Sequence, residues 1–380
     1  MKHHSGGKMV TLKKKRVKAL FVVVSLGLTS LLGSAAIPTV ASSAGMKNVK
    51  IAFLLPQNGV PRFEQLDKPY FEKQIKKLCP KCKVLHYNAQ NEDAAKQQQQ
   101  AEAALAAGAK ILVLCPVDGK AAKVIADLAA KKGVPVVAYE RLVMGSKNVK
   151  AYVTHDGVEI GKMQALSLMA GTKALGISDK PVLMVHGSIT TSDAALFKKG
   201  AQDAFKAAGV KILAEFDTPG WDPAKAQAQM DQWITQYGKD GFGAVYAANG
   251  GTAGGIIASM KAAGIDPSKH PVSGQDADTA EAQRILAGEQ YMTIFRPLKQ
   301  AAAFAATAAW DVLNKKPLSK KVYKSKSNNG AWKVPTLIDP AVSITKANLK
   351  KVMIDGGYTT AADICTPAYE AACTAAGIKK

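Results

Sequence analysis

The sequence lacks the motifs that mark common enzyme classes. It contains no Gly-x-Ser-x-Gly nucleophile motif, no His-Glu-x-x-His metal motif and no phosphate-binding Gly-x-x-x-x-Gly-Lys-Ser/Thr loop. Its six histidines, of which His3 and His4 lie near the start, show no metal-ligand spacing. The stretch from Asn249 to Gly255 is glycine-rich, but no lysine follows it, so it is better interpreted as a helix entry than as a phosphate loop. We therefore expect no enzymatic activity, no cofactor and no metal.

Long apolar runs and internal repeats are absent from the body of the chain. Without a repeat at a spacing of roughly 20 to 50 residues, a solenoid or a propeller is not expected. The 380 residues, 47% of them hydrophobic, suffice for two domains with substantial cores. We expect one compact globular body of two lobes.

The first 44 residues have the pattern of an export signal. Five basic residues between positions 13 and 18 precede a mainly apolar run from Ala19 to Leu32, and small-x-small cleavage sites end at Ala41 and Ala44. A membrane anchor is the alternative, but this helical run would span only about 21 Å of a ~30 Å hydrocarbon core. No cysteine follows the run as a lipid acceptor. We predict a cleaved signal peptide over residues 1–44 and a periplasmic or extracellular protein.

Acidic residues are scarce relative to basic ones. The chain has 51 Lys and Arg against 29 Asp and Glu, a net charge of +22, and seven of the basic residues lie in the leader, which leaves about +15. Nucleic-acid binding is not expected, because the lysines are scattered along predicted helices without an arginine-rich run or interleaved aromatic residues. The charge indicates solvated faces and leaves open an affinity for anionic membrane or wall surfaces.

The five cysteines are compatible with an exported protein. Cys79 and Cys82 have the spacing of a redox centre or of half a zinc site, but no second Cys/His pair and no thioredoxin-like context accompany them. A local disulfide is the preferred interpretation. Cys365 and Cys373 flank a short segment and are expected to staple the C-terminal tail. Cys115 ends an apolar strand and is expected to be a buried thiol.

From Lys50 onward, short β-like runs alternate with amphipathic helical stretches. This alternation is typical of parallel strands joined by crossover helices, so we predict an α/β fold with parallel sheets. Gly108 and Gly133 are expected to end two of the helices. The predicted strands are Lys50–Leu55, Ile111–Leu114, Val134–Ala138, Val182–Val185, Ile212–Glu215, Ala244–Ala247 and Met292–Phe295, and the predicted helices include Arg62–Leu78, Asn91–Ala107 and Gly119–Lys132.

Seven strands and their helices exceed one lobe, so the chain is expected to cross between lobes. We place crossings at residues 151–156, at 273–275 and at 328–334, which form a three-strand hinge. The predicted N-terminal lobe consists of residues 46–152 and 276–325, the C-terminal lobe of residues 153–275 and 326–350, and the tail of residues 351–380. Lobes joined in this way can only bend about a shared hinge.

Polar side chains follow the predicted strands where each strand ends. Ligands of open parallel sheets bind at these carboxyl ends. Arg, Asp, Asn and Thr recur there, and their planar or hydroxyl groups match sugar hydroxyls, which both donate and accept hydrogen bonds. Phe63 and Trp221 could add flat apolar faces. For any one residue, a surface loop or a helix cap is an equally good interpretation, but their joint placement favours a sugar site.

These residues resemble those of the periplasmic sugar-binding proteins of ABC importers with the type I fold, and among them most of all D-xylose-binding proteins. The likeness covers approximately residues 48–365. Its most specific segments are Ala138–Arg141, Asn249–Gly255, Ser273–Asp278 and Met292–Pro297. The resemblance implies two Rossmann-like lobes joined by a three-strand hinge.

The resemblance also implies the site. Arg62, Arg141, Asn249 and Asp276 fall on positions that bind sugar hydroxyls, and Phe63 and Trp221 fall on stacking positions. The chain departs from the xylose pattern at three places: Arg296 stands for a lysine, Thr191 for an aspartate with Asp193 two residues on, and Gly250 for an aspartate. A pentose is therefore expected, with xylose itself left open.

The resemblance implies a monosaccharide ligand, an ABC transporter permease as partner, and a monomer. A sensor that presents the ligand to a chemoreceptor or sensor kinase remains an alternative, since transport and sensing use the same closed form. The same family includes binders of furanosyl signalling molecules. A transcriptional repressor of this fold would need an N-terminal helix-turn-helix, and the chain has a hydrophobic leader there.

Overall fold

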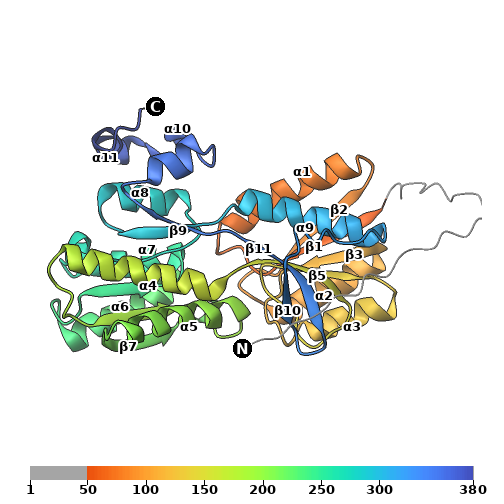
Figure 1. Ribbon diagram of the computed structural model, residues 1–380, viewed down its shortest axis with the longest axis horizontal. Helices are drawn as coiled ribbons and strands as arrows, with labels where there is room; N and C mark the ends of the chain where they lie inside the picture. The colour runs from red at the N-terminus through yellow and green to blue at the C-terminus, as the bar shows by residue number, and fades with distance from the viewer. Residues whose placement is uncertain (1–48, 380) are drawn as a thin grey trace, which may run out of the picture. The chain divides into compact units, whose positions relative to one another are not determined.

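The computed structural model describes residues 49–379, which belong to one compact unit, Gly45–Lys380 (Figure 1). The predicted signal peptide lies outside the described residues. Within the unit, two mainly parallel sheets, each covered by helices on both faces, define a first and a second lobe. Among residues 49–379, no helix combines the length and the apolar character needed to cross a membrane.

The first lobe has a seven-stranded sheet in the order β10-β11-β5-β4-β3-β1-β2, parallel except for the β10–β11 pair. Its strands are β1 (Lys50–Leu55), β2 (Lys83–Asn88), β3 (Ala109–Leu114), β4 (Val136–Tyr139), β5 (Val149–His155), β10 (Ser325–Asn328) and β11 (Lys333–Asp339). Its helices are η1 (Phe63–Asp67), α1 (Lys68–Leu78), α2 (Ala94–Ala106), α3 (Lys123–Lys131) and α9 (Leu298–Leu313).

Strand β1 is buried on both faces, which explains its continuous apolar sequence. Phe53 faces the side covered by α1 and α9, whereas Leu54 faces the side covered by α2 and α3. Helix α9 lies against α1 (Figure 1), and its many buried alanines let the two helices approach closely. Gly108 and Gly133 have φ of 87° and 67° beyond the ends of α2 and α3, which confirms them as helix stops.

The second lobe repeats this layering. Helices α4 and α5 cover one face of the sheet, and α6 and α7 cover the other. The three-stranded sheet β7-β6-β8 continues through isolated bridges, Val245 to Val272 and Gln275 to Ile294, to the antiparallel pair β9–β12. Its elements are α4 (Gly157–Ala174), β6 (Val182–His186), α5 (Ser192–Ala207), β7 (Ile212–Asp217), η2 (Pro219–Trp221), α6 (Pro223–Tyr237), β8 (Ala244–Ala247), α7 (Gly250–Ala262), η3 (Pro267–Lys269), α8 (Thr279–Ala287), β9 (Met292–Phe295) and β12 (Val342–Thr345).

Three crossings connect the lobes, but only one lies where it was predicted. The first follows β5 at His155. The predicted crossings at 273–275 and 328–334 are wrong: the first segment bridges β8 and β9 within the second lobe, and the second belongs to β10 and β11, which pair with β5. The chain instead crosses after β9, at Arg296, and after β11, at Asp339. Residues 276–295 therefore belong to the second lobe, and residues 325–339 to the first.

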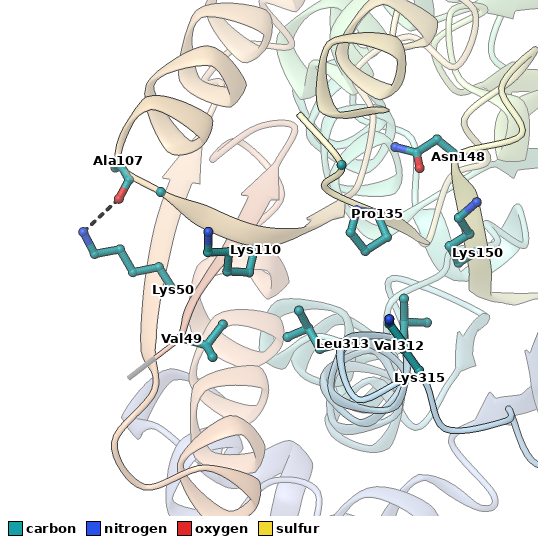
Figure 2. Close-up of a pocket in the computed structure, with 12 residues that line it drawn as sticks. Val49, Lys50, Ala107, Lys110, Pro135, Asn148, Lys150, Val312, Leu313 and Lys315 are labelled. Carbon is teal, nitrogen blue, oxygen red and sulfur yellow. Dashed lines mark hydrogen bonds between the residues drawn. The ribbon is translucent and has the colours of Figure 1, made fainter. Parts of the chain in front are cut away.

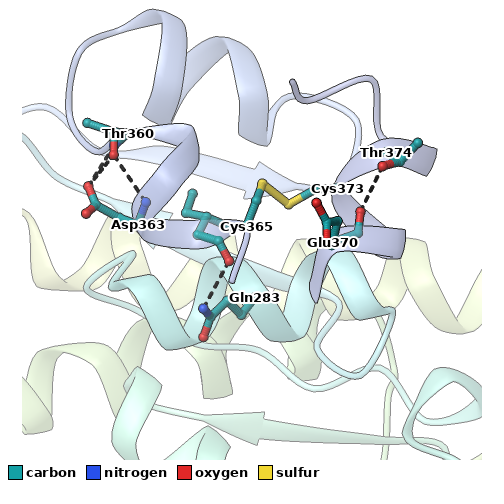
Figure 3. Close-up of a disulfide and its surroundings, with 8 residues drawn as sticks. Gln283, Thr360, Asp363, Cys365, Glu370, Cys373 and Thr374 are labelled. Carbon is teal, nitrogen blue, oxygen red and sulfur yellow. Dashed lines mark hydrogen bonds between the residues drawn. A yellow bond between two sulfur atoms is a disulfide. The ribbon is translucent and has the colours of Figure 1, made fainter. Parts of the chain in front are cut away.

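Two disulfides confirm the predicted cysteine pairing. Cys79 bonds Cys82 and Cys365 bonds Cys373, while Cys115 is buried and free. The second disulfide joins the end of α10 (Ala361–Ile364) to α11 (Glu370–Ala375), across η5 (Pro367–Tyr369). Helix η4 (Lys350–Asp355) precedes them. Their apolar side chains pack on α8, and the Gln283 amide donates to the Ile364 carbonyl at 3.0 Å (Figure 3). The tail is thus an extension of the second lobe.

Candidate functional site

A small cavity of about 20 Å³ lies between the loops that follow strands of both lobes. Loops after β1 and β4 supply one wall, and loops after β6, β7, β8 and residue 274 supply the other. Seven of the nine predicted residues line it. They are Arg62, Phe63, Arg141, Asp193, Trp221, Asn249 and Asp276.

The two aromatic side chains line opposite walls of the cavity. Phe63 is 2% exposed and lies under the guanidinium of Arg62, whose Cζ is 4.5 Å from the ring centroid. Trp221 reaches the cavity because residue 187 is glycine: a Cβ there would lie 2.1 Å from the indole. The buried indole N–H of Trp221 has no hydrogen-bond partner within residues 49–379. Each wall therefore offers a flat ring, and the ring of Trp221 also has a buried N–H without an acceptor among the described residues.

Glu140 lines the cavity and is the centre of its charge network. Its carboxylate accepts two bonds from Arg296, at 2.8 and 3.1 Å, and pairs with Arg62 at 2.6 Å. His155 lies 3.7 Å from the same carboxylate and contacts Arg296. Burial alone would raise the pKa of Glu140, but the guanidinium groups of Arg296 and Arg62 hold it well below its usual range. Glu140 is therefore ionised and holds Arg62 in place.

Two further carboxyl groups border this network. Asp67 lies 3.3 Å from Arg62 and is fully buried. Burial raises the pKa of Asp67 to about 7 in spite of the opposing effect of Arg62, and burial raises the pKa of Asp339 to about 7 in spite of Arg296. Since His155, Arg296 and Asp339 stand at the three crossings, the hinge contributes ionisable groups to the surroundings of Glu140.

Arg141 is held from both lobes. Its Nη1 pairs with Glu92 at 2.9 Å and donates to the Pro116 carbonyl at 3.3 Å, while its Nε lies 3.8 Å from Asp193 of the second lobe. That Nε has no hydrogen-bond partner within the described part of the chain. Arg141 thus keeps one buried donor beside the cavity.

Asn249 and Asp276 play different structural roles. Asn249 is the N-cap of α7, where its side chain accepts from the Thr252 amide at 3.0 Å. Asp276 is not a cap, because Asp278 caps α8. Asp276 instead lies 3.6 Å from Arg62 Nε and 3.7 Å from Arg296, so its carboxylate faces the charges of the first lobe.

The backbone is strained at three residues of the cavity. Glu140, Trp221 and Asp276 have φ of 63°, 56° and 97°, in the left-handed region that non-glycine residues rarely adopt. The carbonyl of Glu140 is fixed by the hydroxyl groups of Tyr152 and Thr154, at 2.9 and 2.8 Å. Strain of this kind clusters at functional sites.

Two predicted site residues do not line the cavity. Thr191 precedes α5, and its hydroxyl donates to the Ser188 carbonyl at 2.9 Å. Arg296 is 1% exposed and lies behind Glu140. The prediction omitted three lining residues, Val60, Glu140 and Gln275. Glu140 and Gln275 directly adjoin the predicted residues Arg141 and Asp276 at strand ends, and this position in the sequence could have identified them as lining residues.

Glu140, His155 and Asp193 present ligand atoms within 4.8 Å of one another. This spacing alone would suit a metal ion. However, two guanidinium groups already occupy the Glu140 carboxylate, and their positive charge opposes a cation. The cluster is therefore better described as part of an ion-pair network than as a metal site.

A larger hollow, of about 900 Å³, lies at the opposite, amino-terminal edge of the first lobe's sheet. Figure 2 shows its apolar floor, with Val312 and Leu313, and a rim of lysines. None of the nine predicted residues lines it, and ligands of such sheets bind at the carboxyl ends of the strands. The smaller cavity is the better candidate.

Comparison with known proteins identifies relatives of this chain. The family described as "Periplasmic binding protein domain" matches residues 51–317. A multiple sugar-binding periplasmic receptor of Rhizobium radiobacter is 31% identical over 287 residues, 70% of this chain and 80% of the relative. A D-xylose-binding periplasmic protein of Haemophilus influenzae is 30% identical over 330 residues, 86% and 95% of the two chains.

Among solved structures, an ABC transporter solute-binding protein from Clostridium phytofermentans with bound β-D-glucose is similar at a TM-score of 0.75 and 29% identity. The similarity covers 83% of this chain and 99% of that one. Proteins of this family are exported carriers that hold a solute without changing it, so the chain is not an enzyme and acts outside the cytoplasm. The chain belongs to the periplasmic binding protein family, among its sugar-binding members with the type I fold.

Proposed function

We propose that the cavity between the lobes binds a monosaccharide, a pentose or a closely related hexose, which the protein delivers to an ABC importer. The observation that carries this proposal is the convergence of two aromatic rings and seven polar side chains on one cavity. Rings suit the C–H faces of a sugar, and carboxylate, amide and guanidinium groups suit its hydroxyls.

The relatives support a sugar but differ in which one. One is named for D-xylose, another for multiple sugars, and the solved relative holds β-D-glucose. The departures at Thr191 and Arg296 lie outside the cavity lining. The lining itself therefore supports a monosaccharide without selecting D-xylose.

Titration calorimetry with D-xylose, D-ribose, L-arabinose, D-galactose and D-glucose tests the ligand. We expect at least one sugar to bind with micromolar or better affinity, about −8 kcal/mol or stronger. Absence of heat for every sugar, at protein concentrations well above that affinity, would refute sugar binding.

Delivery is tested separately, with the cognate transporter in proteoliposomes. The sugar-loaded protein should stimulate ATP hydrolysis more than the sugar-free protein does. A protein that binds sugar with micromolar affinity but never stimulates its transporter would favour the sensor role.

A further inference from the structure

A groove of about 220 Å³ adjoins the cavity at the N-terminus of α7. The two spaces share five lining residues. They are Val60, Arg62, Trp221, Asn249 and Asp276. A sugar that contacts these shared residues from the cavity therefore lies at the inner end of the groove, and a substituent on it can extend outward.

The groove exists because one of its walls is built of glycines. At Gly251 the nearest atom to an added Cβ, on Pro223, would be 3.4 Å away, and at Gly254 the nearest would be Arg284 Nη1, also at 3.4 Å. Both positions can thus accept a side chain without a backbone clash. A side chain at either one would project toward the groove that both residues line, and the glycines leave that space free.

The polar groups of the groove suit an uncharged partner. It is lined by two arginines, Arg62 and Arg284, and by two aspartates, Asp276 and Asp278, so the formal charges balance. Arg284 is fixed by bonds to Gln290 and to the Gly250 carbonyl, both at 2.9 Å. Its Nη1 beside Gly254 has no hydrogen-bond acceptor within residues 49–379 and can donate to a ligand hydroxyl.

We propose that this groove is a second subsite, which takes a neutral, hydroxyl-bearing substituent, such as a second sugar ring, on the sugar held in the cavity. The proposal rests on the proposed function, since the inner sugar anchors the ligand. It extends the ligand class from monosaccharides to glycosides and disaccharides.

The test compares matched ligands on two variants of α7. The probes are D-glucose and D-xylose, their methyl and phenyl glycosides of both anomers, cellobiose, maltose and xylobiose. Gly254→Leu places a leucine in the groove without touching the cavity lining, and leucine is a good helix former. Ala258→Leu, one turn further along α7 on an exposed position, is the control.

We expect at least one substituted sugar to bind the wild type within about tenfold of its parent. Gly254→Leu should weaken that ligand at least tenfold and leave the parent within about threefold, whereas Ala258→Leu should change neither. If parent sugars bind but every substituted sugar is at least a hundredfold weaker, or if Gly254→Leu does not discriminate, the subsite is refuted. If no parent sugar binds, the proposed function fails instead.

Discussion

Replacing Glu140 by glutamine preserves the shape of the side chain and removes the charge that two buried arginines share. Glu140 is 3% exposed, lies 2.6 Å from Arg62 and accepts two bonds from Arg296. Removing one partner of a buried ion pair costs about 3–5 kcal/mol, because the remaining charge stays buried and unpaired. Since glutamine still accepts one hydrogen bond, we expect Glu140→Gln to lose about 3 kcal/mol of unfolding free energy.

The same substitution should weaken sugar binding, because Arg62 lines the cavity and Glu140 is its closest ionic partner. We expect at least a tenfold loss of affinity, or about 1.4 kcal/mol. Urea unfolding followed by circular dichroism measures the first effect, and titration calorimetry on the folded variant measures the second.

Asp355→Asn is the matched control for this experiment. Asp355 pairs with Lys350 at 2.8 Å, but both side chains are about half exposed, so its loss should cost no more than about 0.5 kcal/mol. If Glu140→Gln unfolds at the wild-type urea concentration and binds sugar with wild-type affinity, the role of Glu140 as the centre of the network is refuted.

Three further substitutions test other parts of the site. Asp276→Ala should weaken sugar binding by about 2–4 kcal/mol in calorimetry, whereas Asp278→Ala should keep the affinity for the parent sugar and lose about 0.5–2 kcal/mol of stability through its helix cap. An equal loss of affinity in the two variants would contradict the assignment. Burial raises the pKa of Asp67 to about 7, so between pH values of about 3.9 and 7 the folded carboxyl binds more protons than the unfolded one. The free energy of unfolding of the wild type relative to Asp67→Asn should therefore rise as the pH falls from 7 to 5, by about 1.4 kcal/mol per pH unit in urea titrations. A difference that stays constant with pH would contradict the raised pKa. Sugar should compact the protein in small-angle scattering and change its tryptophan fluorescence. Trp221→Phe should abolish the fluorescence change and leave the compaction intact. A fluorescence change that survives in this variant would assign the signal to another tryptophan.

The strands that carry the site could be predicted because they are buried on both faces. β1, β8 and β9 coincide with the predicted ranges, since continuous apolar runs mark strands covered on both sides. β2 was missed: its side chains are only partly buried and its sequence, Lys-Val-Leu-His-Tyr-Asn, is mixed. β10 and β12 are four-residue strands with exposed positions, which carry little signal of their own.

The crossings depend on pairing between distant segments, which local sequence does not encode. Residues 272–275 resemble a linker because they contain Ser273 and Gly274, yet their partners are Val245 and Ile294. The site residues were predictable where they directly follow a strand, as with Asn249 after β8. Arg296 follows β9 in the same way, but Glu140 lies between it and the cavity, an arrangement that depends on contacts between the lobes.

A crystal structure of the protein with its best-binding sugar tests the central claim most directly. We predict the sugar in the cavity between Phe63 and Trp221, with hydroxyls bonded to Asp276, Asn249 and Arg141. Sugar density at any other place, such as the lysine-rimmed hollow at the opposite edge of the sheet, with the predicted cavity empty, would contradict the account.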